Sequence, residues 1–323
     1  MTLTLSCALA TSLQSHEHAR VAEDLGYTRA FFYDSPALYP DVWVELCRAA
    51  ERTDRIGLGP GVLIPSLRHP LVTASAIGTL VSLAGEDRVV IGVGSGFTGR
   101  LAMGQRPLPW RDVARYVAAV KALLAGEEVD WEGAPIKMIH PAGFAPARPI
   151  RVPFIIASGG PKGTAVAKEL GDGAFGAILP TPGFDWSILL MFGTVLDKGE
   201  DPGSDRAMDA AGHAAGVVLH WALEHDQLAV VPNGADWAAA YDDVPARNRH
   251  LALHAGHLVE VNEHDRPFVS GELLSTIGAA TSPEGLRERL AAAEAGGATE
   301  VAYQPAGPDI PRELEAFVEA ARG

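Results

Sequence analysis

The sequence predicts an α/β fold, a (β/α)8 TIM barrel, because short apolar runs alternate with segments of helical periodicity along all 323 residues. The apolar runs are continuous and rich in Val, Ile and Leu, which is typical of parallel strands buried on both faces. Eight such strand–helix pairs suit a closed barrel of this length. The alternative is a doubly wound open sheet with a small second domain, but no polar linker or change in composition divides the chain. We therefore expect residues 1–323 to form a single barrel domain.

Each strand is expected where an apolar run occurs. These runs lie at 3–10, 29–34, 55–64, 88–95, 153–158, 174–179, 214–223 and 299–304. The helical segments lie at 16–27, 41–54, 69–85, 109–126, 162–173, 184–199 and 311–323, and a long helical region follows the seventh strand. Residues 127–151, which follow the fourth helix, are rich in Pro and Gly and predict an inserted hairpin with a loop. Ser282 and Pro283 have the residue types of an N-cap and a first helical position.

The charge balance restricts the partners of this chain. It has 26 Lys and Arg against 40 Asp and Glu, a formal net charge of −14. A nucleic acid or an anionic membrane would require clustered basic residues, so we expect a small-molecule partner instead. No apolar run approaches the roughly 18 residues of a membrane span, and the amino terminus lacks a basic leader. A cytoplasmic protein is expected, and any anionic ligand must be held by local groups.

Barrels of this kind carry their sites where the strands end, at the carboxyl side. This rule selects a set of candidate residues before any motif is considered. They are Asp34 and Ser35, residues 61–64, residues 95–98, residues 158–163, Leu179 and Pro180, His220 and Trp221, and Gln304.

A glycine loop follows the fifth expected strand and precedes a helix. It consists of Ser158, Gly159, Gly160, Pro161, Lys162 and Gly163. Consecutive N–H groups in such a turn, at the N-terminus of a helix, form a binding site for phosphate. The alternative is a tight turn whose glycines only supply a positive φ.

Two further motifs lie at the ends of strands three and four. Residues 94–99 match G-x-G-x-x-G, but Pro107 and Pro109 prevent the regular helix that a Rossmann loop requires. A glycine-lined strand end approached by a flat ligand is the favoured interpretation. Pro60 and Gly61 interrupt the third strand, which indicates either a bulge at the rim or a plain kink.

Three histidines, His250, His254 and His257, have the spacing of one helical face. The sequence has no H-E-x-x-H pattern, and metal binding would need a convergent acid with an organised second shell of hydrogen bonds. We interpret these residues as a polar face over the barrel mouth and expect no metal.

Taken in order, these motifs resemble the bacterial luciferase-like flavin and deazaflavin oxidoreductases, and among them the methylenetetrahydromethanopterin reductase branch. The resemblance runs over nearly the whole chain. It rests on YDSP (33–36), GPGVLIPSLRHP (59–70), IGVGSGFTGRLAMGQRP (91–107), VPFIIASGGPKGTAVAKELGDGAFGAI (152–178) and TSPEGLRERLAAAEAGGATEVAYQPAG (281–307).

The resemblance implies a luciferase-like barrel that binds coenzyme F420, or less often FMN, at its carboxyl-terminal mouth. It implies a non-prolyl cis peptide at Gly61-Val62, behind the flavin ring. The cofactor phosphate is expected on the loop of residues 158–163. The ring or its ribityl chain is expected near Ser95, Gly96, Phe97 and Thr98. Homodimers are common among such proteins, and one is expected here.

Proton transfer would need a group at the mouth, and Asp34 is the first candidate because burial at the rim could raise its pKa. Its alternative role is a cap or hydrogen bond to a neighbouring loop. Many deazaflavin dehydrogenases of this kind have Asp-His after strand two, whereas this chain has Asp34-Ser35. This difference favours a reductase. An FMN-dependent monooxygenase and a non-catalytic flavin-binding relative are the other hypotheses.

Overall fold

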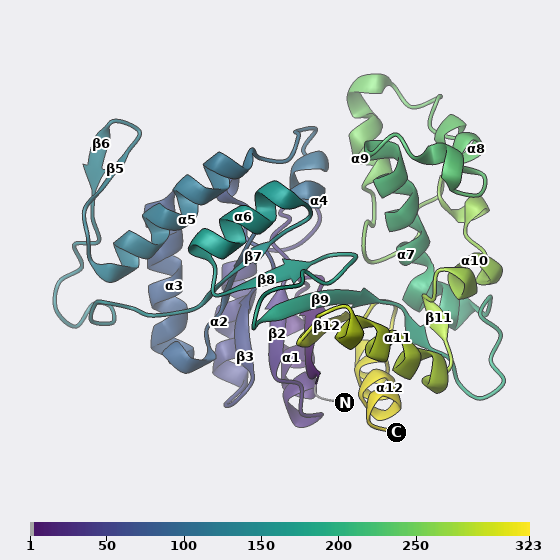
Figure 1. The fold of residues 1–323 in the computed structure, drawn as a ribbon, viewed down its shortest axis with the longest axis horizontal. Coiled ribbons are helices and arrows are strands. Elements are labelled where there is room, and N and C mark those ends of the chain that lie inside the picture. The colour runs from purple at the N-terminus through teal and green to yellow at the C-terminus, as the bar shows by residue number, and fades with distance from the viewer. Residues whose placement is uncertain (1–2) are drawn as a thin grey trace.

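The structure of the protein is a computed structural model, in which residues 3–323 are described. Its centre is a parallel eight-stranded sheet ordered β3-β2-β1-β12-β9-β8-β7-β4 (Figure 1). Bridges between Leu58 and Val89 and between Leu63 and Val93 connect the two edges. In chain order the strands are β1 (Thr4–Leu9), β2 (Arg29–Phe32), β3 (Gly57–Pro60), β4 (Ile91–Val93), β7 (Phe154–Ala157), β8 (Gly173–Gly176), β9 (Ser187–Phe192) and β12 (Glu300–Gln304). The predicted (β/α)8 barrel is confirmed.

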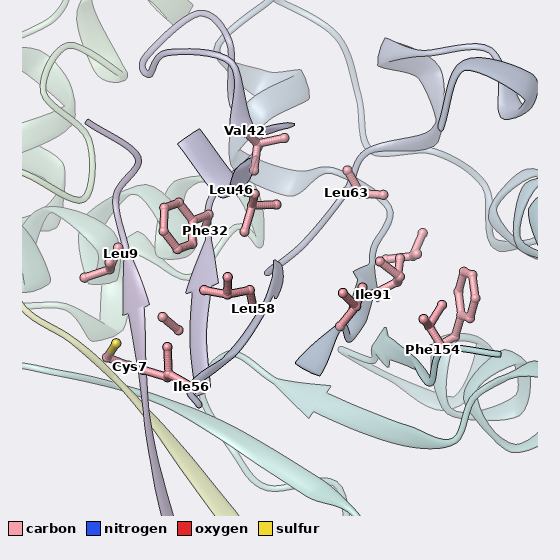
Figure 2. Packing of buried hydrophobic residues seen from close by; sticks show 14 of the residues in the cluster. Cys7, Leu9, Phe32, Val42, Leu46, Ile56, Leu58, Leu63, Ile91 and Phe154 are labelled. Atoms are coloured by element: carbon pink, nitrogen blue, oxygen red, sulfur yellow. The ribbon is translucent and has the colours of Figure 1, made fainter. Parts of the chain in front are cut away.

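Helices cover the outside of the barrel, and their apolar faces form the main core. They are α1 (Ser15–Asp24), α2 (Val42–Arg52), α3 (Pro70–Ala84), α5 (Trp110–Ala125), α6 (Pro161–Leu170), α11 (Pro283–Ala295) and α12 (Ile310–Arg322). In α2 the Asp41 side chain caps the first turn. Figure 2 shows Val42 and Leu46 of α2 near Phe32 of β2, in the same buried cluster. Full burial of each such side chain contributes roughly 1.5–3 kcal/mol.

The barrel interior has its own apolar cluster, because alternate residues of each strand point inward. Phe31 of β2 and Phe175 of β8 meet there edge to face, with ring centroids 5.5 Å apart. Ala8 and Ala302, which lie on the paired strands β1 and β12, belong to the same cluster. The barrel is therefore a packed core, and only its ends can hold a ligand.

The prediction for the seventh strand is wrong. Residues 214–223 lie within α7 (Asp205–Glu224), and the strand is β9, inside the segment expected to be a helix. The run SILLMF in β9 is apolar throughout, and a short run of this kind does not distinguish a strand from a buried helix. The signal for α7 was available, because the Ser204 side chain caps it and Ala recurs along it.

The insertion after the fourth helix is confirmed. β5 (Val129–Trp131) and β6 (Ala134–Ile136) pair antiparallel, and this hairpin stands away from the barrel (Figure 1). Ser282 caps α11 through Gly285 N–H, and Pro283 is its first residue, as predicted.

Residues 205–277 form a helical lobe beside the barrel (Figure 1). Its helices are α7, α8 (Gly234–Ala239), α9 (Arg249–Leu253) and α10 (Gly271–Thr276), and the two-residue strands β10 (Thr194–Val195) and β11 (Ala280–Thr281) pair near its base. The remaining helices are α4 (Phe97–Leu101) and the short η1 (Pro65–Leu67), η2 (Glu86–Arg88), η3 (Leu228–Val230), η4 (Ala246–Asn248) and η5 (Arg266–Phe268). In the range 3–323, every helix is too short or too polar to cross a membrane.

Candidate active site

A bulge marks the rim of the barrel where β3 ends. The Gly61-Val62 peptide is cis, as the resemblance implied. The N–H of Gly61 donates to Phe32 O (2.8 Å), and the N–H of Leu63 donates to Gly92 O (2.8 Å), so the chain continues pairing on both sides of the bulge. A Cβ at Gly61 would lie 2.7 Å from the Cβ of Phe31, so the close approach requires glycine.

The G-x-G-x-x-G motif packs on this bulge. A Cβ at Gly94 would lie 2.7 Å from Val62 Cγ2, and Gly96 has φ +81°, which favours glycine. A helix, α4, does open inside the motif, contrary to our expectation, but it ends at Leu101, before the prolines. The Rossmann interpretation is therefore not needed to explain these glycines. In the first turn of α4, the Phe97 side chain is exposed and that of Thr98 is half-buried.

The glycine loop presents bare backbone at the N-terminus of α6. Gly160 is the residue before the helix, and its φ of 166° is extended backbone that any residue adopts. No described atom lies within 4 Å of a Cβ built on Gly159 or Gly160. A positive φ therefore does not explain Gly160. The open space fits an anion held by backbone N–H groups, and the exposed Lys162 follows two residues later.

The other members of this loop are occupied by contacts within the protein. The Ser158 hydroxyl lies 2.9 Å from that of Thr181, and both residues are buried. A Cβ at Gly163 would lie 2.6 Å from the Trp110 ring, so this glycine allows α5 and α6 to approach closely. Pro161 is exposed and is the first residue of α6, where its fixed φ suits a helix start.

Asp34 is buried at the rim and is already paired. Its carboxylate accepts from the Arg68 guanidinium (2.8 and 2.9 Å) and from Ile64 N–H (3.4 Å). Burial raises the pKa of Asp34 above its ordinary value, although Arg68 opposes this shift. Arg68 also bonds Asp41, the cap of α2. Of the two expected roles, the structure displays the hydrogen bond to a neighbouring loop, and a role in proton transfer stays a prediction.

The histidine segment expected over the mouth contains a stretch whose contacts were not predicted. The mouth segment, residues 254–260, is held by Tyr39, whose hydroxyl donates to His257 O (2.7 Å), and by Gln304, whose amide donates to Leu258 O. Leu258 has φ +68°, an unusual conformation for a bulky residue. Beside this segment lies a cavity of 720 Å³. It is lined by residues 9–14, His18, residues 38–40, residues 256–260, residues 305–308 and Ile310.

The histidines do not lie on one helical face. α9 ends at Leu253, so only His250 is helical, and the chain then turns His254 and His257 inward. His257 Nδ1 lies 2.9 Å from Nδ1 of His220 on α7. His220 therefore does reach the mouth, although from a helix and not from the expected strand. Within the described residues, no group of three or more His, Cys, Asp or Glu is arranged to hold a metal ion.

The sequence of this chain is similar to one protein family and to members of two enzyme groups. Residues 14–300 match the family model described as luciferase-like monooxygenase. An F420-dependent glucose-6-phosphate dehydrogenase of Beutenbergia cavernae is 37% identical over 174 residues, 47% of this chain and 49% of that protein. A 5,10-methylenetetrahydromethanopterin reductase of Methanolobus tindarius is 30% identical over 211 residues, 62% of this chain and 60% of that protein. The chain thus matches only about half of the first relative's length and 60% of the second's.

A solved structure has the same fold over almost all of both chains. The coenzyme F420 dependent tetrahydromethanopterin reductase from Methanopyrus kandleri superposes with a TM-score of 0.68, covering 98% of each chain at 19% identity. At that identity the likeness establishes the fold alone.

Proposed function

The chain belongs to the luciferase-like monooxygenase family, and we propose that it is a coenzyme F420-dependent oxidoreductase that acts as a reductase. In this proposal it transfers a hydride between the deazaflavin and a small organic substrate. The observation that carries the proposal is the bare N-terminus of α6, with open space at Gly159 and Gly160, on a rim that also carries the Gly61-Val62 bulge. The Beutenbergia cavernae relative is an F420-dependent dehydrogenase, which supports the choice of cofactor.

The residues present fit such a cofactor. Gly159, Gly160 and Lys162 would hold its phosphate, because backbone N–H groups, a helix N-terminus and a lysine all attract an anion. The cofactor ring would lie between the bulge at residues 61–62 and residues 95–98. These two segments are close together because Val62 of the bulge packs against Gly94, which directly precedes residue 95. When bound, a deazaflavin supplies a carbon centre that gives or accepts hydride. The chain's own part is to orient the reactants and to exclude water.

The cavity indicates the class of substrate, and we propose an uncharged one. None of its lining residues within the described chain is Lys or Arg. His18 is its one basic side chain besides His257, and burial lowers the pKa of His18. Glu260 adds a negative charge to the wall. A phosphate ester or a polycarboxylate would meet no permanent positive charge there.

The experiment is a parallel titration of the purified protein with coenzyme F420 and FMN, followed by fluorescence. Preferential binding of the deazaflavin supports the proposal. Preference for FMN, or binding of neither, overturns it. Reduction of cyclohexanone and oxidation of glucose 6-phosphate are then compared. Turnover of the phosphorylated sugar at the higher kcat/KM would contradict the uncharged-substrate proposal while leaving the cofactor assignment intact.

We also propose a homodimer. Val44 on α2 and Val72 on α3 are 58% and 55% exposed, and these two helices are neighbours on the outside of the barrel. Apolar side chains gathered on adjacent helices are common in subunit interfaces. Light scattering after gel filtration tests this, and a monomer at micromolar concentration would refute it.

A further inference from the structure

We propose that Asp265, His220 and His257 form a proton relay that ends at the cavity, with His257 Nε2 as the atom that exchanges a proton with the substrate. The inference rests on the proposed function, because reduction of a carbonyl group by hydride also requires a proton at oxygen. His257 lines the cavity and is the catalytic member of the relay. His220 and Asp265 act through it.

The inner end of the relay is a fixed carboxylate. Asp265 is buried, and its oxygens accept from Trp237 Nε1 (2.7 Å), the Tyr241 hydroxyl (2.7 Å) and Asn262 Nδ2 (3.0 Å). Burial alone would raise the pKa of Asp265, but hydrogen bonds from its neighbours lower it below the ordinary value. Asp265 is therefore a buried negative charge in a fixed position.

The middle of the relay is a pair of imidazoles. His220 Nε2 lies 3.3 Å from Asp265 Oδ2, at ion-pairing distance but without the alignment of a regular hydrogen bond. On its other side, His220 Nδ1 lies 2.9 Å from His257 Nδ1. Two ring nitrogens at this distance share one proton, since one must donate and the other accept. The outer nitrogen, His257 Nε2, lies 3.4 Å from the Thr98 hydroxyl on α4.

In this proposal His220 holds the mobile proton of the relay. Burial, together with neighbouring histidines, places the pKa of His257 well below its ordinary value. His220, in contrast, has the Asp265 carboxylate 3.3 Å from its Nε2. The titratable groups that face His257 are His213 and His220 of α7, His254 of its own segment, and Tyr39, which donates to its carbonyl.

The proton step balances without a charged His257. A reduced deazaflavin, when bound, would supply hydride to the carbonyl carbon, and the π electrons of the C=O bond would move to oxygen. That oxygen takes the proton of His257 Nε2, and His257 Nδ1 takes the proton that His220 Nδ1 held. A proton from solvent then enters at His257 Nε2, and the proton on His257 Nδ1 returns to His220. The same steps in reverse remove a proton from an alcohol.

The first test compares variants in the reduction of cyclohexanone by reduced F420. We expect His257→Gln to lower kcat about 100-fold, the usual contribution of a general acid. KM and the Kd for F420 should stay within about threefold. His254→Gln is the matched control, because His254 lies on the same segment and packs against the rings of His220 and His257, but its Nδ1 hydrogen-bonds the His250 carbonyl. A loss below fivefold in His257→Gln, or an equal loss in the control, would overturn the relay.

The second test needs no turnover. In the cofactor-free protein, histidine ring signals are followed by NMR as a function of pH. Because the positive charge of His220 helps to depress the pKa of His257, His220→Gln should raise that pKa. In the turnover assay of the first test, Asp265→Asn, which keeps the shape of the side chain, should flatten the pH dependence of kcat. If the pKa of His257 is the same in His220→Gln as in the wild type, the coupling is refuted.

The two tests separate this inference from the proposed function. Failure of the wild-type protein to bind F420 would end the proposed function, whereas the NMR titration would still report the coupled histidines. Conversely, full F420 turnover with His257→Gln would leave the proposed function standing and remove the relay.

Discussion

The two ends of the barrel treat buried polar groups in opposite ways. At the amino-terminal end, the buried Glu300 carboxylate accepts from Ser6 (2.5 Å), Arg29 (2.6 Å) and Trp186 (2.8 Å). At the mouth, both ring nitrogens of the buried His213 lack a hydrogen-bond partner among the described residues. Glu300 is thus satisfied by the protein itself, whereas His213 is not.

A second carboxylate repeats the pattern at the amino-terminal end. Glu23, at the end of α1, accepts from the N–H groups of Asp54, Arg55 and Ile56, which lead into β3. The mouth has the reverse arrangement, in which a Cβ built on Gly159 or Gly160 would have no described atom within 4 Å. The amino-terminal end therefore secures the fold, whereas the mouth keeps binding capacity for a ligand. Four substitutions test this division.

The largest effect is expected at Glu300. Glu300→Gln keeps the shape of the side chain but leaves Arg29 without its ion-pair partner in a half-buried position. Breaking such a pair costs roughly 3 kcal/mol. We expect urea denaturation to report this loss in the free energy of unfolding, with the Kd for F420 unchanged. A change in cofactor affinity with unaltered stability would contradict the division between the two ends.

Asp34→Asn tests a carboxylate at the mouth that is satisfied by the protein in the way that Glu300 and Glu23 are at the amino-terminal end. Because Asp34 pairs with Arg68, its substitution should lower the free energy of unfolding by about 2 kcal/mol. We expect the turnover of cyclohexanone to change less than about threefold. If turnover instead fell by about two orders of magnitude while stability stayed constant, the proton role would belong to Asp34.

Gly160→Asp should weaken F420 binding about tenfold, which corresponds to about 1.4 kcal/mol. The new carboxylate would occupy the open space and repel a phosphate, but Asp is a favourable N-cap and should not destabilise α6. Gly160→Asn is the control, since it has the same size and capping ability without the charge. Fluorescence titration measures both. Equal affinities in the two variants would remove the phosphate from this loop.

The smallest effect is expected for Glu23→Gln, about 1 kcal/mol at neutral pH. Backbone hydrogen bonds hold the pKa of folded Glu23 below its ordinary value of 4.5, although burial opposes them. The stabilisation is therefore present above pH 4.5 and is lost as pH falls through the lowered pKa of the folded state. Wild type and variant should converge in stability in acid. A difference that persists at about pH 2 would show that shape, not charge, is responsible.

Most of the barrel could be predicted from the sequence because seven of its strands carry clear signals. Interior Pro60 and Gly61 also located the bulge. The error at β9 and α7 has a physical cause, since a central strand and a buried helix are both apolar throughout.

The site was predicted less completely. The loop of residues 158–163 was found from its glycines, but Gly163 proved to be a packing position. The histidines of the mouth segment were expected over the mouth, but the contacts that hold the segment were not predicted, because they are distant in sequence: Tyr39 and His257 are 218 residues apart. The left-handed Leu258 has no local signal either, since tertiary contacts hold it there.

The packing of the Trp110 ring against Gly163 has a consequence for protein engineering. It anchors the first turn of α6 to α5, while a Cβ on Gly159 or Gly160, directly before that turn, would have none of the atoms of residues 3–323 within 4 Å. Side chains could therefore be introduced at these two positions without moving the helix behind them. A library restricted to these two residues would vary the preference between phosphorylated and unphosphorylated flavins and leave the scaffold intact.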